Sequence, residues 1–202
     1  MADTNQRTAD DVEKRVLEVI ARAMDRPVSE VRPESSLEMD LGAESLDYLD
    51  IAFSLEREFR IQFPRADFMQ RAGAHFGEEN LVRDGVITDL GLRLLARGMP
   101  ELDPTQLRTG LKVTEVRKMF SVATFIRVVK QLLEAKEKMD RTCPDCGAQM
   151  SESPSLPEFV CPSCGKSVPL PSGDDILFDH VVGVELAEAQ ARTQNEGGGA
   201  SA

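Results

Sequence analysis

The chain has 202 residues, enough for one large domain or two small ones, and its formal net charge is -11. Aromatic residues make up 5% of the chain and tryptophan is absent, so a small helical core fits the composition better than a large β-sandwich. Nucleic acid and anionic membranes repel a chain this acidic, whereas basic protein surfaces attract it. No run is apolar enough to span a bilayer, and the first residues do not resemble a signal peptide. These features predict a cytoplasmic protein with no membrane span.

A first amphipathic helix is predicted from Thr8 to about Asp25. Thr8 can cap its N-terminus, and acidic residues in the first turn favour the positive end of the helix dipole. Apolar residues recur at four-residue spacing and should form the buried face: Val12, Val16, Ile20 and Met24. The following stretch, 26–44, is rich in Pro, Ser and Gly and indicates a long loop.

A second helix is predicted to begin at Ser45 and to stop at Pro64. Its apolar side is expected from Leu46, Leu49, Ala52, Phe53 and Phe59. The acidity of the chain concentrates over 28–50, where seven carboxylates accompany one basic residue, Arg32. Such a run is either a solvated helix face or a surface for a basic partner, and the charge pattern alone leaves both open.

The stretch 65–118 has a weaker pattern. A helix is predicted around 87–97, with its leucines directed inward: Leu90, Leu94 and Leu95. Asp103 followed by Pro104 indicates a helix start, because proline is favoured at the first helical position.

A strong amphipathic helix is predicted from Ser121 to about Lys136. A strand is expected within 171–188, from the apolar residues Ile176, Leu177, Val181, Val182 and Val184. The glycine-rich C-terminus predicts a flexible tail.

The loop before the second helix ends in the motif Asp40-Leu41-Gly42-Ala43-Glu44-Ser45-Leu46-Asp47. A serine at such a junction would expose its hydroxyl, and the backbone N–H groups of a helix N-terminus attract phosphate. The alternative is that Ser45 is simply an N-cap, a position where serine is favoured.

This motif resembles the signature of acyl carrier proteins. The likeness continues through the second helix and the turn after it, with Leu49, Leu55-Glu56, Phe59, Ile61 and Phe63-Pro64. The start of the helix at Ser121 resembles the last helix of the family, so the resemblance covers roughly 8–64 and 119–137.

The resemblance implies a mainly α fold, a four-helix carrier bundle that is not itself an enzyme. In this family a phosphopantetheinyl transferase moves a 4′-phosphopantetheine arm from coenzyme A to the motif serine, here Ser45. The thiol of the arm then carries acyl groups as thioesters between enzymes of fatty acid, lipid or polyketide biosynthesis.

The acidic run gains a role from the same resemblance. Glu44, Asp47, Asp50 and Glu56 match positions where the family meets basic docking patches on acyl-handling enzymes. Contacts of this type speed and orient encounters. Leu46 and Leu49 match positions near the arm that serve docking or acyl-chain burial, and the alternative for both is core packing.

The sequence departs from the family at three places, and two of them, Glu44 and the insertion, support a second hypothesis. Glu44 stands where the family usually has Asp, Arg57 replaces an acidic position, and the insertion 65–118 separates the second helix from the last. The second hypothesis is a carrier-like adaptor without an arm, which recruits a protein partner through the zinc ribbon predicted below.

The four cysteines form two near-copies of one turn, Cys143-Pro-Asp-Cys146-Gly and Cys161-Pro-Ser-Cys164-Gly. Two such turns supply four thiolates that can surround one ion as a tetrahedron. This pattern predicts a closed, structural zinc site in a zinc ribbon. The glycine after each second cysteine permits the positive φ that such a turn can need. An iron–sulfur centre is the alternative.

The composition of the ribbon argues against nucleic-acid binding. Between Cys143 and Leu170 there is one basic residue, Lys166, and phosphate binding needs clustered Lys and Arg. Protein docking and a metal-held cap on the carrier domain remain open. The two histidines, His75 and His180, lie in no recognisable catalytic or metal motif, so a non-catalytic protein is expected.

These patterns predict three parts. The acyl carrier domain is expected over 8–138, with 65–118 as a helical insertion. A small zinc ribbon with four cysteine ligands and the segment after it are expected over 143–188, and a disordered tail over 189–202.

Overall fold

The computed structural model describes residues 2–64 and 68–197. It divides the chain into two units: unit 1 comprises Met1–Arg65 and Lys118–Gly173, and unit 2 comprises Ala66–Arg117 and Asp174–Ala202. This division places the ribbon with the carrier helices, and the C-terminal segment with the insertion. None of the described helices is long and apolar enough to cross a membrane.

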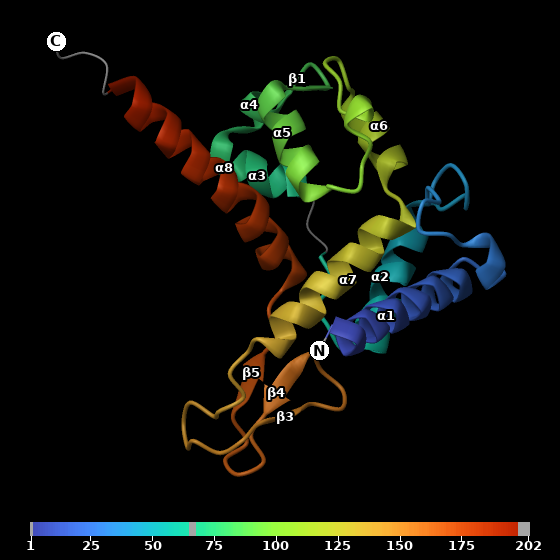
Figure 1. Cartoon of the computed structure of the whole chain (residues 1–202), viewed down its shortest axis with the longest axis vertical. Coiled ribbons are helices and arrows are strands. Elements are labelled where there is room, and N and C mark those ends of the chain that lie inside the picture. Colours follow the sequence, from blue (N-terminus) through green and yellow to red (C-terminus); the bar gives the residue numbers. More distant parts are fainter. Residues whose placement is uncertain (1, 65–67, 198–202) are drawn as a thin grey trace. The chain divides into compact units, whose positions relative to one another are not determined.

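Unit 1 contains a helical bundle made by α1 (Ala2–Ala23), α2 (Ser45–Phe59) and α7 (Val122–Glu137), which contact one another (Figure 1). The three predicted helices are confirmed, although α1 begins six residues before Thr8. Each helix buries one apolar stripe, as the periodicity predicts. The fully buried residues include Val16, Ile20, Ile51, Leu55, Val122 and Val129.

The loop 26–44 is anchored on this bundle. It contains the short helix η1 (Val28–Glu30), and Leu37 and Leu41 are buried. The N–H of Leu37 donates to the carbonyl of Phe120 at 3.1 Å, and Ser36 pairs with Ser121 as an isolated bridge. The start of α7 therefore fixes the loop that leads to Ser45.

The ribbon is a three-stranded antiparallel sheet in the order β3-β4-β5, with β3 at Ser151–Glu152, β4 at Glu158–Val160 and β5 at Ser167–Pro169. Its small buried cluster comprises Cys143, Met150, Phe159, Cys161 and Leu170. Two of these five residues are predicted metal ligands, so the cysteines are part of the ribbon's core.

Unit 2 begins with α3 (Phe68–Phe76) and α4 (Glu78–Leu81), followed by the hairpin of β1 (Val82–Arg83) and β2 (Val86–Ile87). The hairpin turns at Asp84 and Gly85, both with positive φ, as a two-residue turn requires. The predicted helix around 87–97 is confirmed as α5 (Asp89–Gly98), with Leu94 and Leu95 buried and Leu90 half-buried.

Short helices complete the insertion. The predicted start at Asp103 is confirmed: it caps η2 (Pro104–Gln106), and its carboxylate accepts from the N–H of Thr105 at 2.8 Å. That hydrogen bond lowers the pKa of Asp103. The helices α6 (Val113–Val116) and η3 (Arg117–Met119) lead back towards α7.

The C-terminal segment is one long helix, α8 (Gly173–Gly197), so the strand predicted within 171–188 is wrong. Val181 of α8 joins Ala72, Leu81 and Leu94 in the buried cluster of unit 2. Burial of this side against the insertion overrides the local β preference of the valines and isoleucine. The helix also covers most of the predicted disordered tail, 189–202, and the part beyond Gly197 lies outside the described residues.

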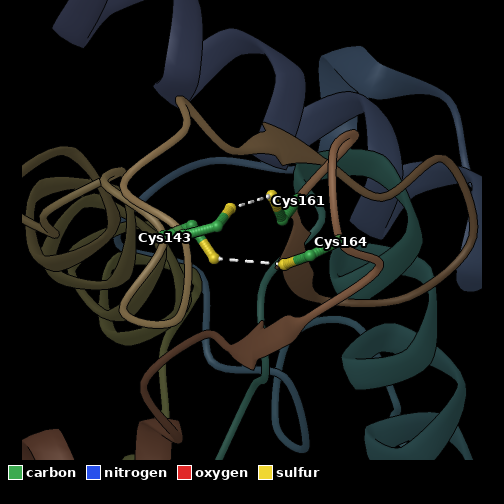
Figure 2. A group of neighbouring side chains, drawn as sticks. Cys143, Cys161 and Cys164 are labelled. Carbon is green, nitrogen blue, oxygen red and sulfur yellow. Dashed lines mark hydrogen bonds between the residues drawn. The ribbon is translucent and has the colours of Figure 1, made fainter.

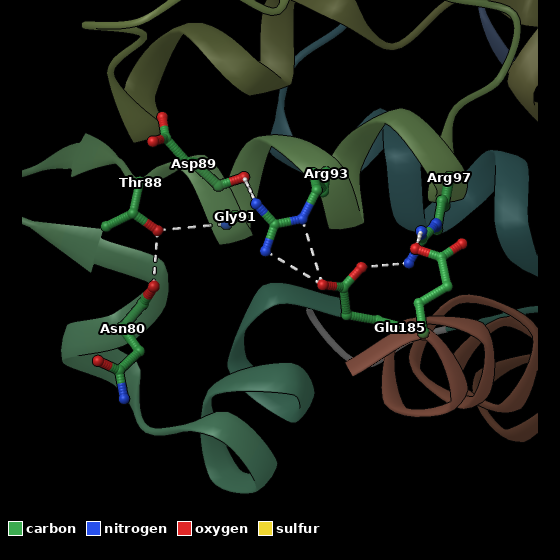
Figure 3. A network of polar contacts seen from close by, with 8 residues as sticks. Asn80, Thr88, Asp89, Gly91, Arg93, Arg97 and Glu185 are labelled. Atoms are coloured by element: carbon green, nitrogen blue, oxygen red, sulfur yellow. Dashed lines mark hydrogen bonds and ion pairs between the residues drawn. The ribbon is translucent and has the colours of Figure 1, made fainter. Parts of the chain in front are cut away.

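Glu185 of α8 forms ion pairs with two arginines of α5 (Figure 3). Its side chain is 2% exposed and accepts from Arg93 at 3.1 Å and from Arg97, which also pairs with Glu188. A buried carboxylate requires such partners. Arg71 of α3 pairs with Asp175 at 2.7 Å and lies over the ring of Phe178, so α8 is held along its first half.

Candidate functional site

Ser45 lies at the first position of α2 and is exposed. The N-cap position belongs to Glu44, with φ -101° and ψ 176°, so Ser45 is not the N-cap. The alternative in which the serine serves only as a cap is therefore contradicted by the helix boundary.

Asp47 closes the N-terminus of α2. Its carboxylate accepts from the N–H of Glu44 at 2.7 Å, and its own N–H donates to the carbonyl of Glu44 at 3.0 Å. The first of these two bonds, from the N-cap N–H to the side chain three residues later, is one half of a capping box. The sequence predicts a docking role for Asp47 and not this one, although an acidic residue three positions after the N-cap is the sequence signal for it.

The loop that precedes Ser45 is fixed by a buried residue and by hydrogen bonds to its backbone. Gly42 has φ +74°, a left-handed conformation that favours glycine. Ala43 is buried, and its N–H donates to the carbonyl of Leu37 at 2.8 Å. Arg26 donates to the carbonyl of Leu41 at 3.2 Å, a contact that no sequence motif indicated.

An exposed apolar stripe extends from Ser45 along α2. Leu46 is 76% exposed, Leu49 50% and Phe53 49%, so these three residues of the expected apolar side do not face the core. The buried side of α2 consists instead of Ile51, Ala52, Leu55 and Phe59. Core packing is thus excluded for Leu46 and Leu49, and neighbouring exposed apolar side chains of this kind are consistent with the docking role that the sequence left open.

The predicted acidic residues divide into two groups. Glu44, Asp47 and Asp50 lie at the N-terminal half of α2, around Ser45. Glu56 lies near the other end, where its carboxylate accepts from the N–H of Phe63 at 3.0 Å and fixes the turn after the helix. The structure therefore brings three of the four predicted carboxylates together with the serine.

The four cysteine sulfurs lie within 4.8 Å of one another. The Cys143 and Cys164 sulfurs are 3.6 Å apart, and those of Cys146 and Cys161 are 3.5 Å apart (Figure 2). A tetrahedron with Zn–S bonds of about 2.3 Å has edges of about 3.8 Å, so the sulfurs have the spacing of a zinc site. None of the four is in a disulfide.

The two cysteine turns have the same backbone geometry. The N–H of Gly147 donates to the carbonyl of Cys143 at 2.9 Å, and that of Gly165 to Cys161 at 3.0 Å. Both glycines have positive φ, +74° and +76°, as the sequence predicts.

The thiols influence one another strongly. The N–H of Cys164 donates to the Cys161 sulfur and lowers the pKa of that thiol to about 6. The N–H of Lys166 acts in the same direction on Cys164, but the neighbouring sulfurs outweigh it and raise the pKa of Cys164 to about 12. Four thiolates this close repel one another, and a divalent cation at their centre removes that repulsion. The residues present therefore fit a metal ion.

Among the described residues, the four cysteines are the only group of three or more His, Cys, Asp or Glu side chains placed to share a metal ion. Lys166, the basic residue of the ribbon, pairs with Asp145 at 3.7 Å, which further weakens a nucleic-acid interpretation. His75 is exposed on α3 and lies edge-on to Phe76 and Phe178, so its contacts are aromatic.

Comparison with known proteins agrees with this geometry. Residues 14–73 match the family described as phosphopantetheine attachment site, a segment that includes Ser45 and ends in α3. A stretch of 45 residues is 42% identical to acyl carrier protein 3 of Ralstonia nicotianae and covers 22% of this chain and 52% of that protein. No solved structure matched the chain. Residues 14–73 of this chain are therefore similar to the phosphopantetheine attachment site family and to part of an acyl carrier protein, and a four-cysteine ribbon follows in the same chain.

Proposed function

We propose that this protein carries acyl groups as thioesters on a 4′-phosphopantetheine arm attached to Ser45, for fatty acid, lipid or polyketide biosynthesis. The observation that carries the proposal is the position of Ser45. Its side chain is exposed at the start of α2, while Glu44 occupies the N-cap and Asp47 closes the helix end. An exposed serine at this position, within the segment that matches the family, supports modification at Ser45.

The attachment reaction follows from the chemistry of coenzyme A. The Oγ of Ser45 forms a phosphodiester with the phosphorus next to pantetheine, and the pyrophosphate bond of coenzyme A breaks. Adenosine 3′,5′-bisphosphate leaves, and the hydroxyl proton passes to a base of the transferase. The first-turn N–H groups and the dipole of α2 favour the resulting negative charge.

The surface around Ser45 supports docking to basic enzymes. Glu44, Asp47 and Asp50 supply negative charge, and the exposed Leu46, Leu49 and Phe53 supply apolar contact area. We propose a phosphopantetheinyl transferase and acyl-handling enzymes with basic docking patches as partners, in the cytoplasm. Because charged contacts mainly raise association rates, docking should weaken as salt rises.

We further propose that Cys143, Cys146, Cys161 and Cys164 hold one structural zinc ion. A closed site with four sulfurs leaves no position for a substrate, so the ion would stabilise the ribbon without taking part in acyl transfer.

The experiment is an intact-mass measurement of the full chain before and after incubation with coenzyme A and a broad-specificity transferase. We expect a gain of one phosphopantetheine group in the native protein and no gain in Ser45→Ala. Ser54→Ala, a second serine on α2, is the matched control and should be loaded normally.

The adaptor hypothesis makes the opposite prediction. Its support is the additional structure, unit 2 and the ribbon, which a carrier function does not require. Absence of any mass gain with several transferases, on a folded and zinc-loaded sample, would contradict the carrier proposal and favour the adaptor.

A further inference from the structure

The ribbon contacts the carrier bundle at the end of α2 that lies away from Ser45. The chain leaves α7, forms the three strands and returns to residues that directly follow α2. Ser45 and the C-cap Arg60 are separated by the full helix, about 22 Å along its axis. The contacts of the ribbon therefore act on the carrier helix at a distance from the attachment site.

Lys136 makes the first contact. This residue of α7 is 8% exposed, and its ammonium donates to the carboxylate of Glu152 in β3 at 2.8 Å and to the carbonyl of Arg60 at 3.4 Å. Arg60 has a left-handed backbone, with φ 52°. A buried ammonium needs such partners. Through Lys136, the ribbon and the C-terminus of α2 thus share one charged group.

Gly173 makes the second contact, where the chain leaves the ribbon. Its N–H donates to the carbonyl of Gln62 at 2.8 Å, and Ser172 pairs with Gln62 as an isolated bridge. A Cβ at Gly173 would lie 2.5 Å from Pro64 and 2.7 Å from the carbonyl of Gln62. The segment that follows the ribbon and the segment that follows α2 are therefore in close backbone contact.

Both contacts depend on the fold of the ribbon. Glu152 is paired with Phe159 of β4, and Phe159 is fully buried with Cys143 and Cys161. If the cysteine site opens, this cluster loses two of its members, and Glu152 loses its fixed position opposite Lys136. A ligand that stabilises the folded ribbon must therefore also stabilise the ordered C-terminal end of α2.

We propose that the ribbon is a metal-dependent brace on the carrier helix: zinc at the four cysteines stabilises the C-terminal end of α2 through Lys136–Glu152 and Gly173–Gln62. The proposal rests on the zinc site proposed above and is independent of whether Ser45 is loaded. Because coupling between two sites is reciprocal, loosening the brace must also weaken zinc binding.

The first test is hydrogen–deuterium exchange of the full chain with and without zinc. We expect peptides over 56–64 to exchange about tenfold faster without zinc, the change that loss of one charge-assisted hydrogen bond produces. Peptides over 45–55, in the same helix, should change less and serve as the internal reference.

Glu152→Gln tests the brace without removing a proposed zinc ligand. It removes the carboxylate but leaves all four cysteines, so zinc should remain bound while exchange over 56–64 rises. Glu158→Gln, on the neighbouring strand, is the matched control and should leave exchange over 56–64 unchanged. Unchanged exchange over 56–64 in the zinc-free chain or in Glu152→Gln would overturn the brace and leave the zinc site intact.

The reciprocal test measures zinc affinity by competition with a chelator. Lys136→Met should release zinc about tenfold more readily, whereas Lys138→Met, at an exposed lysine of the same helix end, should not. Equal affinities in the two variants would overturn the coupling. A chain that binds no zinc would overturn the zinc site together with the brace, and mass analysis of Ser45 loading would still decide the carrier function separately.

Discussion

The bundle and the ribbon belong to the same unit but are stabilised in different ways. The bundle buries branched aliphatic side chains from α1, α2 and α7, including Val16, Ile51 and Val129. The ribbon buries five residues, two of which are cysteines of the proposed metal site. A long helix can bury enough apolar area to be stable, whereas strands of two or three residues cannot. The chemistry that stabilises each region therefore decides how each should respond to perturbation.

Removal of zinc should produce the largest difference in stability between the ribbon and the bundle. Metal binding contributes about 10–16 kcal/mol to modules of this kind, so a chelator should unfold 143–170 and leave the bundle folded. Hydrogen exchange across the whole chain measures both regions in one sample. Continued protection of the strands in a demonstrably zinc-free protein would show that the apolar cluster alone stabilises the ribbon.

Leu55→Ala should affect the bundle in the complementary way. Leu55 is 0% exposed, and truncation of a buried leucine costs about 2–5 kcal/mol. Leu49→Ala, on the exposed side of the same helix, should cost less than about 0.5 kcal/mol. The chain has one tyrosine, Tyr48 on α2, and no tryptophan, so tyrosine fluorescence in urea reports on the bundle selectively. Equal costs for the two variants would contradict the assignment of the buried side of α2.

Glu185→Ala should destabilise unit 2 without changing unit 1. Loss of its hydrogen bonds to Arg93 and Arg97 should cost about 1–3 kcal/mol. Glu188→Ala is the control, because Glu188 is 48% exposed and surface ion pairs contribute about 0–1 kcal/mol. Exchange of peptides from α5 and α8 gives the measurement, while Tyr48 fluorescence should stay constant. A change in Tyr48 fluorescence would show that the two units unfold together.

Asp47→Ala should have the smallest effect on stability. Loss of the carboxylate that accepts from Glu44 should cost about 1 kcal/mol and fray the turn that carries Ser45. Asp50→Ala removes an equal charge one turn later without touching the cap. The midpoint temperature of thermal unfolding and the rate of transferase loading should therefore fall further for Asp47→Ala than for Asp50→Ala. Equal loading rates for the two variants would mean that the charge of Asp47 matters and its capping does not.

Local patterns in the sequence were sufficient for much of the fold and of the site. Ser45 at a helix start, the amphipathic helix after Ser121 and the repeated cysteine turns were all predicted, because each depends on residues close together in the chain. The face of α2 was not predicted. Leu46, Leu49 and Phe53 share one side of that helix and Ile51 and Leu55 lie on another, so hydrophobicity alone could not show which side contacts α1 and α7.

The sequence by itself determined where the chemistry lies: a serine at the start of a helix and four thiols at metal spacing. Tertiary structure alone decided what surrounds that chemistry. The segment 171–188 became a helix because the insertion, far away in the sequence, covers its apolar side. Lys136 and Glu152 met because the ribbon folds back onto the end of α2. Short-range patterns encode turns, caps and ligand spacing, whereas burial and ion pairing between distant residues exist only once the chain has folded.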